Sequence, residues 1–419
     1  MGRPRRLSAI AIGVALVSTA ASCSDDEPTG TSVADTASTT TTAVVVDDGV
    51  LTIGVLLPIT GAGSELGTVM RDAIELAADE VRAADDGRPV ELIVVDETEL
   101  GGTLPPALEE IFGEDVDAIV GPASNLLTER LLPMTVSARV LTCSPTASAI
   151  SLDAVPDGGL FVRTIPSDSM QARALARQLD ATGTEIVLAH VDDPFGVPFV
   201  ERVRNELNLF GATVVDVVPF DPRQSEYGEV ADRIVGSGAA TIGVIGDPEA
   251  GPRLMQALGA VVDPGVQTSI WMNDAMRVPQ STSYRRLPSG VLALMQGVSP
   301  RSSVADPEAA ARLPEGGRFF GANAYDCLNL IALAAHEADS TIGTAIAQQV
   351  TVVTSGGTPC STYPTCLTSL DAGRSVDYDG PGGALDIGVS GDPSVGAFEL
   401  YRFGSSGLDE RFGDVVRVP

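Results

Sequence analysis

Small polar side chains gather in two loops near the N-terminus. The first loop contains Ser124 and Asn125, and the second runs from Ser144 to Ser148. Each loop follows a short apolar run, and a helical stretch lies between them, which together indicate a βαβ unit. Ligands of open α/β sheets bind at the carboxyl ends of strands, where both loops fall. Hydroxyl and amide groups beside free N–H groups at helix starts suit an anionic group such as a carboxylate.

An alternative role for these residues is structural. Ser124, Asn125 and Ser148 belong to the residue types that most often cap helices. For a single loop, capping would be the better interpretation. Two such loops one strand apart favour a ligand site.

Motifs of catalysis are absent from the sequence: it contains no G-x-S-x-G, no P-loop and no H-E-x-x-H. Gly61–Gly63 begins a dinucleotide pattern, but Leu66 stands where the third glycine is required. The two histidines, His190 and His336, give no zinc spacing and no obvious triad. We therefore expect a protein that is not an enzyme and that has no metal or other cofactor. A hydrolase that uses only carboxylates is an alternative.

The length and the charge of the chain limit its class. A chain of 419 residues is too long for one small core, so two domains are expected. Its 56 acidic and 26 basic residues give a formal net charge of -30. This acidity argues against nucleic acid or an anionic membrane surface as a partner.

The N-terminal residues are typical of an export signal. Three arginines within the first six residues precede an apolar run, Leu7–Val17, that is too short to span a bilayer. Small residues then lead to Cys23 and resemble a lipobox, although Ala20 replaces the usual leucine. We expect residues 1–23 to be a lipoprotein signal peptide ending at the lipidated Cys23, with an ordinary signal peptide as the alternative. Residues 24–48, rich in Ser, Thr and Asp, predict a flexible tether.

Apolar runs and helical periodicities alternate through the rest of the chain. Strands are predicted at Leu51–Leu57, Val90–Val95, Phe161–Thr164, Glu185–His190, Thr213–Val218, Thr241–Ile245, Ser269–Met272, Val291–Met295, Leu385–Ile387 and Gly396–Phe403. Helices are predicted at Val69–Ala83, Leu104–Phe112, Ser169–Leu179, Phe199–Leu209, Tyr227–Val235, Leu254–Leu258 and Asn323–Ala338. Two successive runs of this kind, each about the size of a domain, predict two doubly wound α/β domains.

Four cysteines follow the leader. Cys360 and Cys366 bracket a short Gly/Pro-rich stretch, and in an exported protein a local disulfide between them is expected. Cys143 and Cys327 lie in apolar strand and helix patterns. We expect buried free thiols there, while the sequence leaves open whether they pair.

The order and spacing of several segments carry a resemblance to a known family. These are IGVLLPITG (53–61), GTVMRDAIELAADE (67–80), DAIVGPASN (117–125), LTCSPTASAIS (141–151), FVRTIPSDSMQARALA (161–176), VDDPFG (191–196), ANAYDCLNLIALA (322–334) and VDYDGPGGALDIGVSGDPSVGAFELYRF (376–403). From Leu51 to about Phe403 the chain resembles the type I periplasmic solute-binding proteins of ABC importers, in the branched-chain amino acid-binding (Leu/Ile/Val-binding protein-like) branch.

The resemblance implies an α/β fold of two doubly wound lobes joined by a three-stranded hinge. Lobe one would comprise residues 50–167 and 299–345, and lobe two residues 168–298 and 346–419. A ligand would sit between the lobes, which close on it by hinge motion.

The resemblance also implies a set of ligand-binding residues. They are Leu66, Ser124, Asn125, Thr146, Ala147, Ser148, Phe195, Asp247 and Asp274. Ser148 would hold the α-carboxylate of an amino acid with its hydroxyl and N–H groups, and Asp274 would pair with the α-ammonium. Asn125 and Phe195 depart from the serine and tyrosine of the family, so another small polar solute is also compatible.

The function that follows is that of an extracytoplasmic solute-binding lipoprotein on the outer face of the cell membrane. It would capture a small polar, amino acid-like ligand and deliver it to ABC permease subunits. Its contact with the membrane would be through the lipid anchor only, with no nucleic acid partner. The alternative is a sensor or regulator of the same fold, for example for an amide or another small carboxylate.

Overall fold

The structure is a computed structural model of the chain. It describes residues 47–84, 87–100, 111–183, 185–265, 269–277, 283–301, 304, 307–318, 320–407 and 409–419. The predicted leader with Cys23, the tether up to residue 46 and most of the predicted helix Leu104–Phe112 lie outside these residues.

A five-stranded parallel sheet forms the centre of the first lobe, with strand order β2-β1-β3-β4-β5. Its strands are β1 (Leu51–Leu57), β2 (Val90–Asp96), β3 (Ala118–Val120), β4 (Leu141–Ser144) and β5 (Phe161–Arg163). Alternate residues of β1 face two different cores: Ile53 and Val55 lie in one hydrophobic cluster and Leu56 in another. Because side chains alternate along a strand, this pattern shows that both faces of the sheet are covered.

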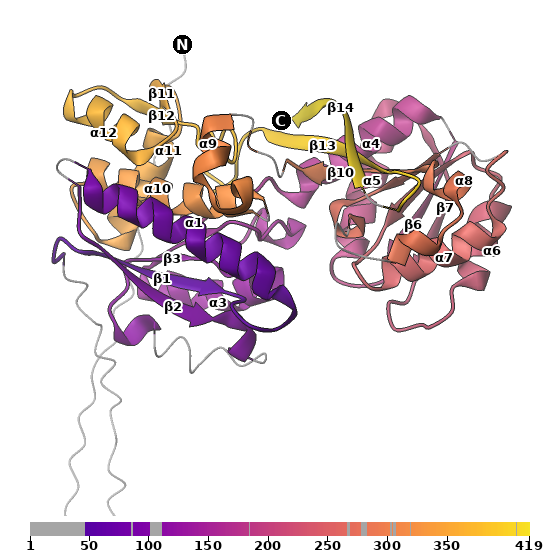
Figure 1. Cartoon of the computed structure of the whole chain (residues 1–419), viewed down its shortest axis with the longest axis horizontal. Coiled ribbons are helices and arrows are strands. Elements are labelled where there is room, and N and C mark those ends of the chain that lie inside the picture. The colour runs from indigo at the N-terminus through magenta and orange to yellow at the C-terminus, as the bar shows by residue number, and fades with distance from the viewer. Residues whose placement is uncertain are drawn as a thin grey trace, which may run out of the picture. The chain divides into compact units, whose positions relative to one another are not determined.

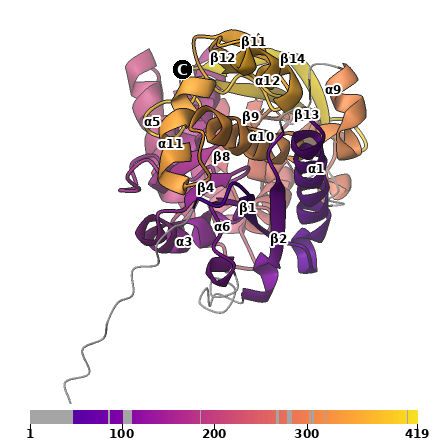
Figure 2. The same cartoon turned by 90° about the vertical axis from the view of Figure 1, so that its left-hand side faces the viewer.

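Helices cover the first sheet from segments far apart in the sequence. They are α1 (Ser64–Ala83), α3 (Asn125–Ala138), α9 (Pro307–Arg312), α10 (Gly321–Glu337), α11 (Gly343–Val353) and α12 (Tyr363–Asp371). The predicted apolar helix is α10, which is buried continuously from Gly321 to Ala335. It lies between α1 and α11 (Figures 1 and 2), which explains why it is apolar on nearly all sides.

The second lobe is built on a seven-stranded sheet with strand order β14-β13-β10-β9-β8-β6-β7. Its strands are β6 (Glu185–Val191), β7 (Thr213–Phe220), β8 (Thr241–Ile245), β9 (Ser269–Met272), β10 (Met295–Pro300), β13 (Gly396–Phe403) and β14 (Asp409–Val418). β13 pairs antiparallel with both β10 and β14, and the remaining pairs are parallel. The helices are α4 (Asp168–Thr182), α5 (Gly196–Phe210), α6 (Gly228–Gly236), α7 (Ala250–Val261) and α8 (Ser289–Leu292).

The prediction of two doubly wound α/β lobes is confirmed, but the predicted boundary at residue 345 does not match the packing. Ile346, Tyr363, Val376 and Ile387 lie in the hydrophobic core that contains β1. This stretch includes the two-stranded sheet of β11 (Thr358–Cys360) and β12 (Val376–Tyr378). The third passage between the lobes therefore falls after Ile387 and before β13.

Two predicted strands are wrong. The run Val291–Met295 is divided, since Val291 and Leu292 belong to α8 while Met295 begins β10. A short apolar run does not by itself distinguish a buried strand from a buried helical turn. Leu385–Ile387 forms no strand, although Ile387 makes an isolated antiparallel bridge with Pro393.

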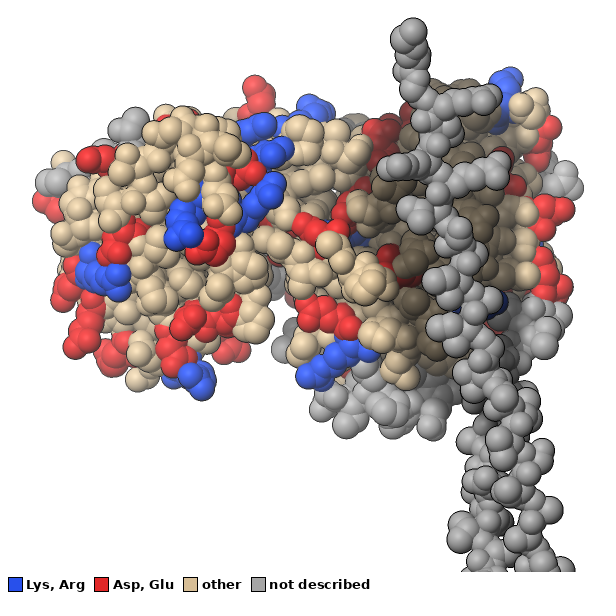
Figure 3. Space-filling view, turned by 180° about the vertical axis from the view of Figure 1, so that it is seen from behind, with Lys and Arg blue, Asp and Glu red and all other residues tan. Residues whose placement is uncertain are grey.

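The surface of the described residues carries the acidic excess of the sequence. In the view of Figure 3, Asp and Glu side chains are spread over the described surface, with Arg scattered among them. None of the helices in the described parts of the chain is both long enough and apolar enough to cross a membrane.

Candidate ligand-binding site

The two polar loops that follow β3 and β4 are hydrogen-bonded to each other. The Ser144 hydroxyl donates to the Pro122 carbonyl at 2.7 Å, and the Thr146 hydroxyl donates to the Ala123 carbonyl at 2.9 Å. The Asn125 side-chain oxygen accepts the Ala149 N–H at 3.1 Å. These hydrogen bonds join the two loops at the carboxyl edge of the sheet.

Tight backbone packing places the first loop. Gly121 has φ +110°, and a Cβ atom there would lie 2.0 Å from the Leu56 carbonyl oxygen. Only glycine combines this backbone conformation with so close an approach to a neighbouring strand. The Gly121–Pro122 bond that follows is cis.

Ser124 and Asn125 have different roles, although they are neighbours. The Ser124 hydroxyl accepts the Leu127 N–H at 3.4 Å and is the N-cap of α3, as the structural alternative predicted. The Asn125 side chain instead accepts the N–H of Ala149, the residue that follows the second loop.

Ser148 of the first lobe is hydrogen-bonded to the first residue of α4 in the second lobe. Its carbonyl oxygen accepts the Asp168 N–H at 2.8 Å, and its side chain acts to lower the pKa of the Asp168 carboxyl group. Within the described residues, the Ser148 N–H donates to no acceptor, in contrast to the Ala147 and Ala149 N–H groups. Ser148 therefore offers one backbone donor beside its hydroxyl.

The half-buried carboxylate of Asp274 lies near Asp168. Burial raises the pKa of Asp168, and the negative charge of nearby Asp274 raises it further. Burial likewise raises the pKa of Asp274, while its hydrogen bond with Gln171 acts in the opposite direction. The Gln171 side chain is fully buried, and its oxygen has no hydrogen-bond partner. The cluster of Ser148, Asp168, Gln171 and Asp274 thus has more acceptors than donors.

Glu97 supplies another buried carboxylate, next to the first loop. It lies in a short 3-10 helix after β2, is 7% exposed, and accepts the Ala123 N–H at 2.8 Å. Desolvation raises its pKa to about 7, although hydrogen bonds from the Ala123 and Ser124 N–H groups partly oppose the shift. The chain itself therefore supplies the acceptor for the Ala123 N–H, two residues before α3, where an anionic group of a ligand was expected.

Two predicted residues follow adjacent strands of the second lobe. The Asn273 side chain exchanges two hydrogen bonds with the backbone of Gly246, at 2.9 and 3.0 Å. Asp247 and Asp274 follow these two residues, so they leave the same edge of the sheet. The Asp247 carboxylate accepts the Glu249 and Ala250 N–H groups at the start of α7, which is a capping role.

Phe195 and Leu66 contact apolar groups. The Phe195 ring lies 5.6 Å from that of Phe199 and packs against both hydrophobic clusters of the second lobe. Leu66 is half-buried in the first turn of α1 and packs on the core of the first lobe.

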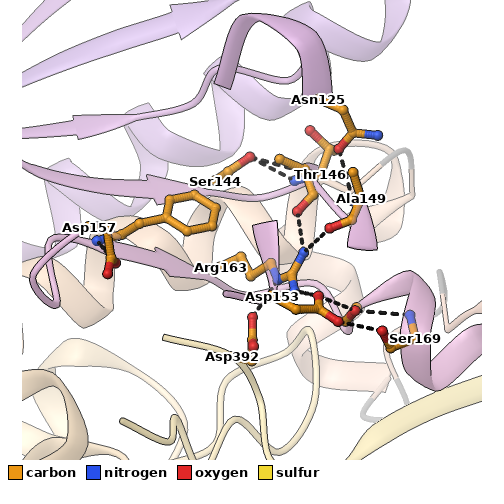
Figure 4. A network of polar contacts seen from close by, with 12 residues as sticks. Asn125, Ser144, Thr146, Ala149, Asp153, Asp157, Arg163, Ser169 and Asp392 are labelled. Carbon is orange, nitrogen blue, oxygen red and sulfur yellow. Dashed lines mark hydrogen bonds and ion pairs between the residues drawn. The ribbon is translucent and has the colours of Figure 1, made fainter. Parts of the chain in front are cut away.

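One arginine joins the second loop to several other segments (Figure 4). Arg163, at the end of β5, is fully buried and is ion-paired with Asp153 at 2.5 Å and Asp392 at 2.6 Å. Its guanidinium group also donates to the carbonyl oxygens of Ala147 and Ala149, each at 3.2 Å.

Four residues of the site were not predicted from the sequence: Glu97, Arg163, Asp168 and Gln171. Asp168 and Gln171 are three residues apart at the start of α4, so both lie on one face of that helix. This spacing was a usable signal, because polar residues on a buried helical face need partners. Arg163 gave no such signal, because its partner Asp392 is 229 positions away.

The described residues include no group of three or more His, Cys, Asp or Glu side chains that could hold a metal ion. The polar groups present suit instead a small organic ligand with donors for the carboxylates and an acceptor for Ser148.

The chain is similar to known proteins over most of its length. The model of a family described as "Periplasmic binding protein" matches residues 50–388. A curated relative is the chemotactic signal transduction system substrate-binding protein BasB of Halobacterium salinarum. It is 26% identical over 380 residues, which cover 86% of this chain and 89% of the relative.

Solved structures share the fold at lower identity. The leucine binding protein LivK of Thermotoga maritima has a TM-score of 0.67 and 17% identity, covering 87% of this chain and 98% of that one. A solute binding protein of Rhodopseudomonas palustris HaA2, solved with p-hydroxybenzoic acid, has a TM-score of 0.66 and 19% identity, covering 88% of this chain and 97% of that one.

Proposed function

Because the chain belongs to the periplasmic binding protein family, we propose that it is an extracytoplasmic solute-binding lipoprotein that captures an amino acid-like ligand and delivers it to an ABC permease. Cys23 is the lipid attachment site in this proposal. The observation that carries the proposal is the cluster of Ser148, Asp168 and Asp274, which puts a hydroxyl and a free backbone donor beside one buried and one half-buried carboxylate.

The two carboxylates favour a ligand with a protonated amine. An ammonium group has three N–H donors, and Asp168, Asp274 and the unpartnered oxygen of Gln171 provide acceptors for them. Ligand binding would then relieve the repulsion between the two carboxylates and satisfy the amide oxygen. Buried charges are stable only when they are paired in this way.

The two carboxylates of this cluster favour amino acids over simple carboxylates, and both kinds of ligand occur in similar proteins. One of the matched structures contains isoleucine and another contains p-hydroxybenzoic acid. A ligand that has only a carboxylate would offer nothing to Asp168 and Asp274 and would be repelled by them. An α-amino acid can place its carboxylate on the Ser148 N–H and hydroxyl groups and its ammonium on the acids.

Calorimetry tests this assignment with L-leucine and benzoate as probes. We expect L-leucine to bind and benzoate not to bind. Asp274→Ala should weaken leucine binding by a factor of tens or more, because loss of one partner in a desolvated charged contact costs about 2–5 kcal/mol. Ser148→Ala should weaken it less, because the backbone N–H remains. Asp247→Ala is the matched control, since that carboxylate only caps α7.

Two outcomes would overturn the ligand assignment. Leucine binding that survives Asp274→Ala within a factor of three would show that the ammonium is held elsewhere. Binding of benzoate but not leucine would show that the ligand has no amine. Mass spectrometry of the ligand released from the purified, denatured protein identifies the natural solute directly.

A second candidate function is supported by the similarity to BasB, which is named as a chemotactic signal transduction protein. In this alternative the ligand-bound chain presents itself to a membrane receptor instead of a permease. Cross-linking in intact membranes, followed by identification of the captured subunit, separates the two functions.

A further inference from the structure

The guanidinium group of Arg163 is fully buried and contacts three different segments of the chain. Its Nε donates to Asp392 at 2.6 Å, and its Nη2 donates to Asp153 at 2.5 Å. Its Nη1 donates to the carbonyl oxygens of Ala147 and Ala149. Residues 144–149 are called the Ser148 loop below. Figure 4 shows the planar group between this loop and the two acids.

These contacts fix the backbone on both sides of Ser148. Arg163 holds the carbonyl groups of residues 147 and 149, and the Asp168 N–H holds the carbonyl group of Ser148 itself. The N–H groups of Ala147 and Ala149 are held by the Ser144 hydroxyl and the Asn125 side chain. Within the described residues, the Ser148 N–H is the one amide of residues 146–149 that donates to no acceptor. The contacts of the loop therefore fix its backbone and leave the Ser148 N–H available to a ligand.

The two acids that neutralise Arg163 are each associated with a segment that passes between the lobes: Asp153 contacts one such segment, and Asp392 lies on another. Asp153 also accepts the hydroxyl groups of Ser167 and Ser169, at the start of α4 on the first passage. Asp392 lies on the third passage, where the Gly391 carbonyl also accepts the Arg163 backbone N–H at 2.9 Å. One buried cation thus ties the ligand loop to two of the three connections between the lobes.

We propose that Arg163 is a positioning residue that holds the Ser148 loop in its ligand-binding geometry and couples that geometry to the first and third connections between the lobes. This inference rests on the proposed function of Ser148 as a ligand contact. A change in the path of either connection moves Asp153 or Asp392, and through Arg163 it moves the carbonyl groups that flank Ser148.

Lysine cannot replace arginine in this role. The guanidinium group is a planar fork with five donors, whereas an ammonium group is a single point with three. Arg163→Lys keeps the charge but cannot reach two acids and two carbonyl groups at once. Asp392→Asn is the matched control, because it removes one ion pair and leaves the two carbonyl contacts of Nη1 in place.

The first test needs no ligand. Hydrogen exchange of the ligand-free full-length protein, followed by mass spectrometry, reports the opening of residues 144–150. Arg163→Lys should speed exchange of the Ala147 and Ala149 amides by about tenfold or more, as expected for loss of hydrogen bonds to a charged group. Asp392→Asn should speed exchange of these two amides less than Arg163→Lys does, because the two carbonyl contacts of Nη1 remain.

The second test measures coupling, with L-leucine as the probe. If Arg163 acts through Ser148, its replacement by lysine should weaken leucine binding less in a Ser148→Ala background than in the wild type, so that the two changes are non-additive. A general loss of stability would leave the effects additive. If the wild type does not bind leucine, the proposed ligand class is wrong, and the exchange result still decides the positioning role.

Unchanged exchange at Ala147 and Ala149 in folded Arg163→Lys protein would overturn the proposal. Faster exchange in every region to the same extent would also overturn it, because it would show a structural role alone. If Arg163→Lys does not fold, Asp153→Asn is the second variant, since it retains Arg163 and removes one charged partner. It should give a smaller increase confined to residues 144–150 and the start of α4, and exchange equal to that of the wild type would count against the proposal.

Discussion

Cys143 and Cys327 form a disulfide that joins β4, the strand leading into the Ser148 loop, to the buried helix α10. The expectation of free thiols at these positions was wrong. The two residues are 184 positions apart in sequence, and the spacing pattern gave no sign that the fold brings them together. The Thr164 hydroxyl contacts the Cys327 sulfur, so the first connection between the lobes lies beside this bridge.

Loss of this disulfide should destabilise the protein more than loss of the Cys360–Cys366 disulfide, which closes a separation of six. In the chain-entropy model the longer loop contributes about 5 kcal/mol and the shorter about 2 kcal/mol. Urea unfolding of Cys143→Ala/Cys327→Ala, compared with Cys360→Ala/Cys366→Ala, measures the difference. Equal losses in the two double variants would contradict the prediction.

Stability should fall as the pH rises through the range in which Glu97 titrates. Its pKa is about 7 in the folded protein against a reference value of 4.5, so the folded state binds more protons than the unfolded state between these values. The stabilising contribution is complete below about pH 4.5 and is lost as the pH rises through 7, with a size of about 3 kcal/mol. Glu97→Gln should reduce the slope of unfolding free energy against pH.

The remaining slope should come from other buried carboxylates. Burial also raises the pKa values of Asp117 and Asp326 to about 7. A Glu97→Gln protein with the same pH slope as the wild type would show that Glu97 is ionised in the folded state throughout this range.

A loop in the first lobe should not tolerate a methyl group at Gly380. Asp326 accepts the Tyr378 hydroxyl and the Gly382 N–H, both at 2.8 Å, and a Cβ on Gly380 would lie 1.9 Å from its carboxylate. Gly380→Ala should therefore lower the midpoint of thermal unfolding by several degrees, corresponding to a loss of about 1–3 kcal/mol. Gly236→Ala in α6 is the control, because nothing lies within 4 Å of its Cβ position, and it should be neutral or slightly stabilising.

Cys23→Ser should release the protein from membranes without changing its fold. The prediction follows from the charged and apolar leader that ends in small residues before Cys23. Fractionation of cells that express the wild type and the variant measures it, with circular dichroism of the released protein as the control for folding. Retention of the variant in the membrane fraction would contradict the lipobox interpretation.

The sequence predicted helices and strands correctly where the hydrophobic pattern allowed only one kind of element. Leu51–Leu57 is predicted and observed with the same bounds, because a continuous aliphatic run covered on both faces has few other solutions. The helix predicted from Phe199 begins at Gly196, since its first turn has no periodic apolar residue. The helices α11 and α12 were missed because short, mixed segments owe their structure to packing against α10 and its neighbours.

The site was less predictable than the fold. The sequence identifies loops rich in hydroxyl and amide groups. It does not show which acceptor binds the N–H groups of such a loop. Glu97 takes the Ala123 N–H, and this contact joins residues 26 positions apart. Pairings of this kind depend on the register of neighbouring strands, which local composition does not encode.

The core of the first lobe is completed only late in synthesis. β1 and α1 are made first, yet they pack against α10 and against residues as far along the chain as Ile387. A nascent chain that has emerged only as far as β10 has α1 and α3 but lacks α10 and the later segments, so the core that contains Ile53 and Val55 is incomplete. The core of this lobe therefore cannot be completed before almost the whole chain has been translated.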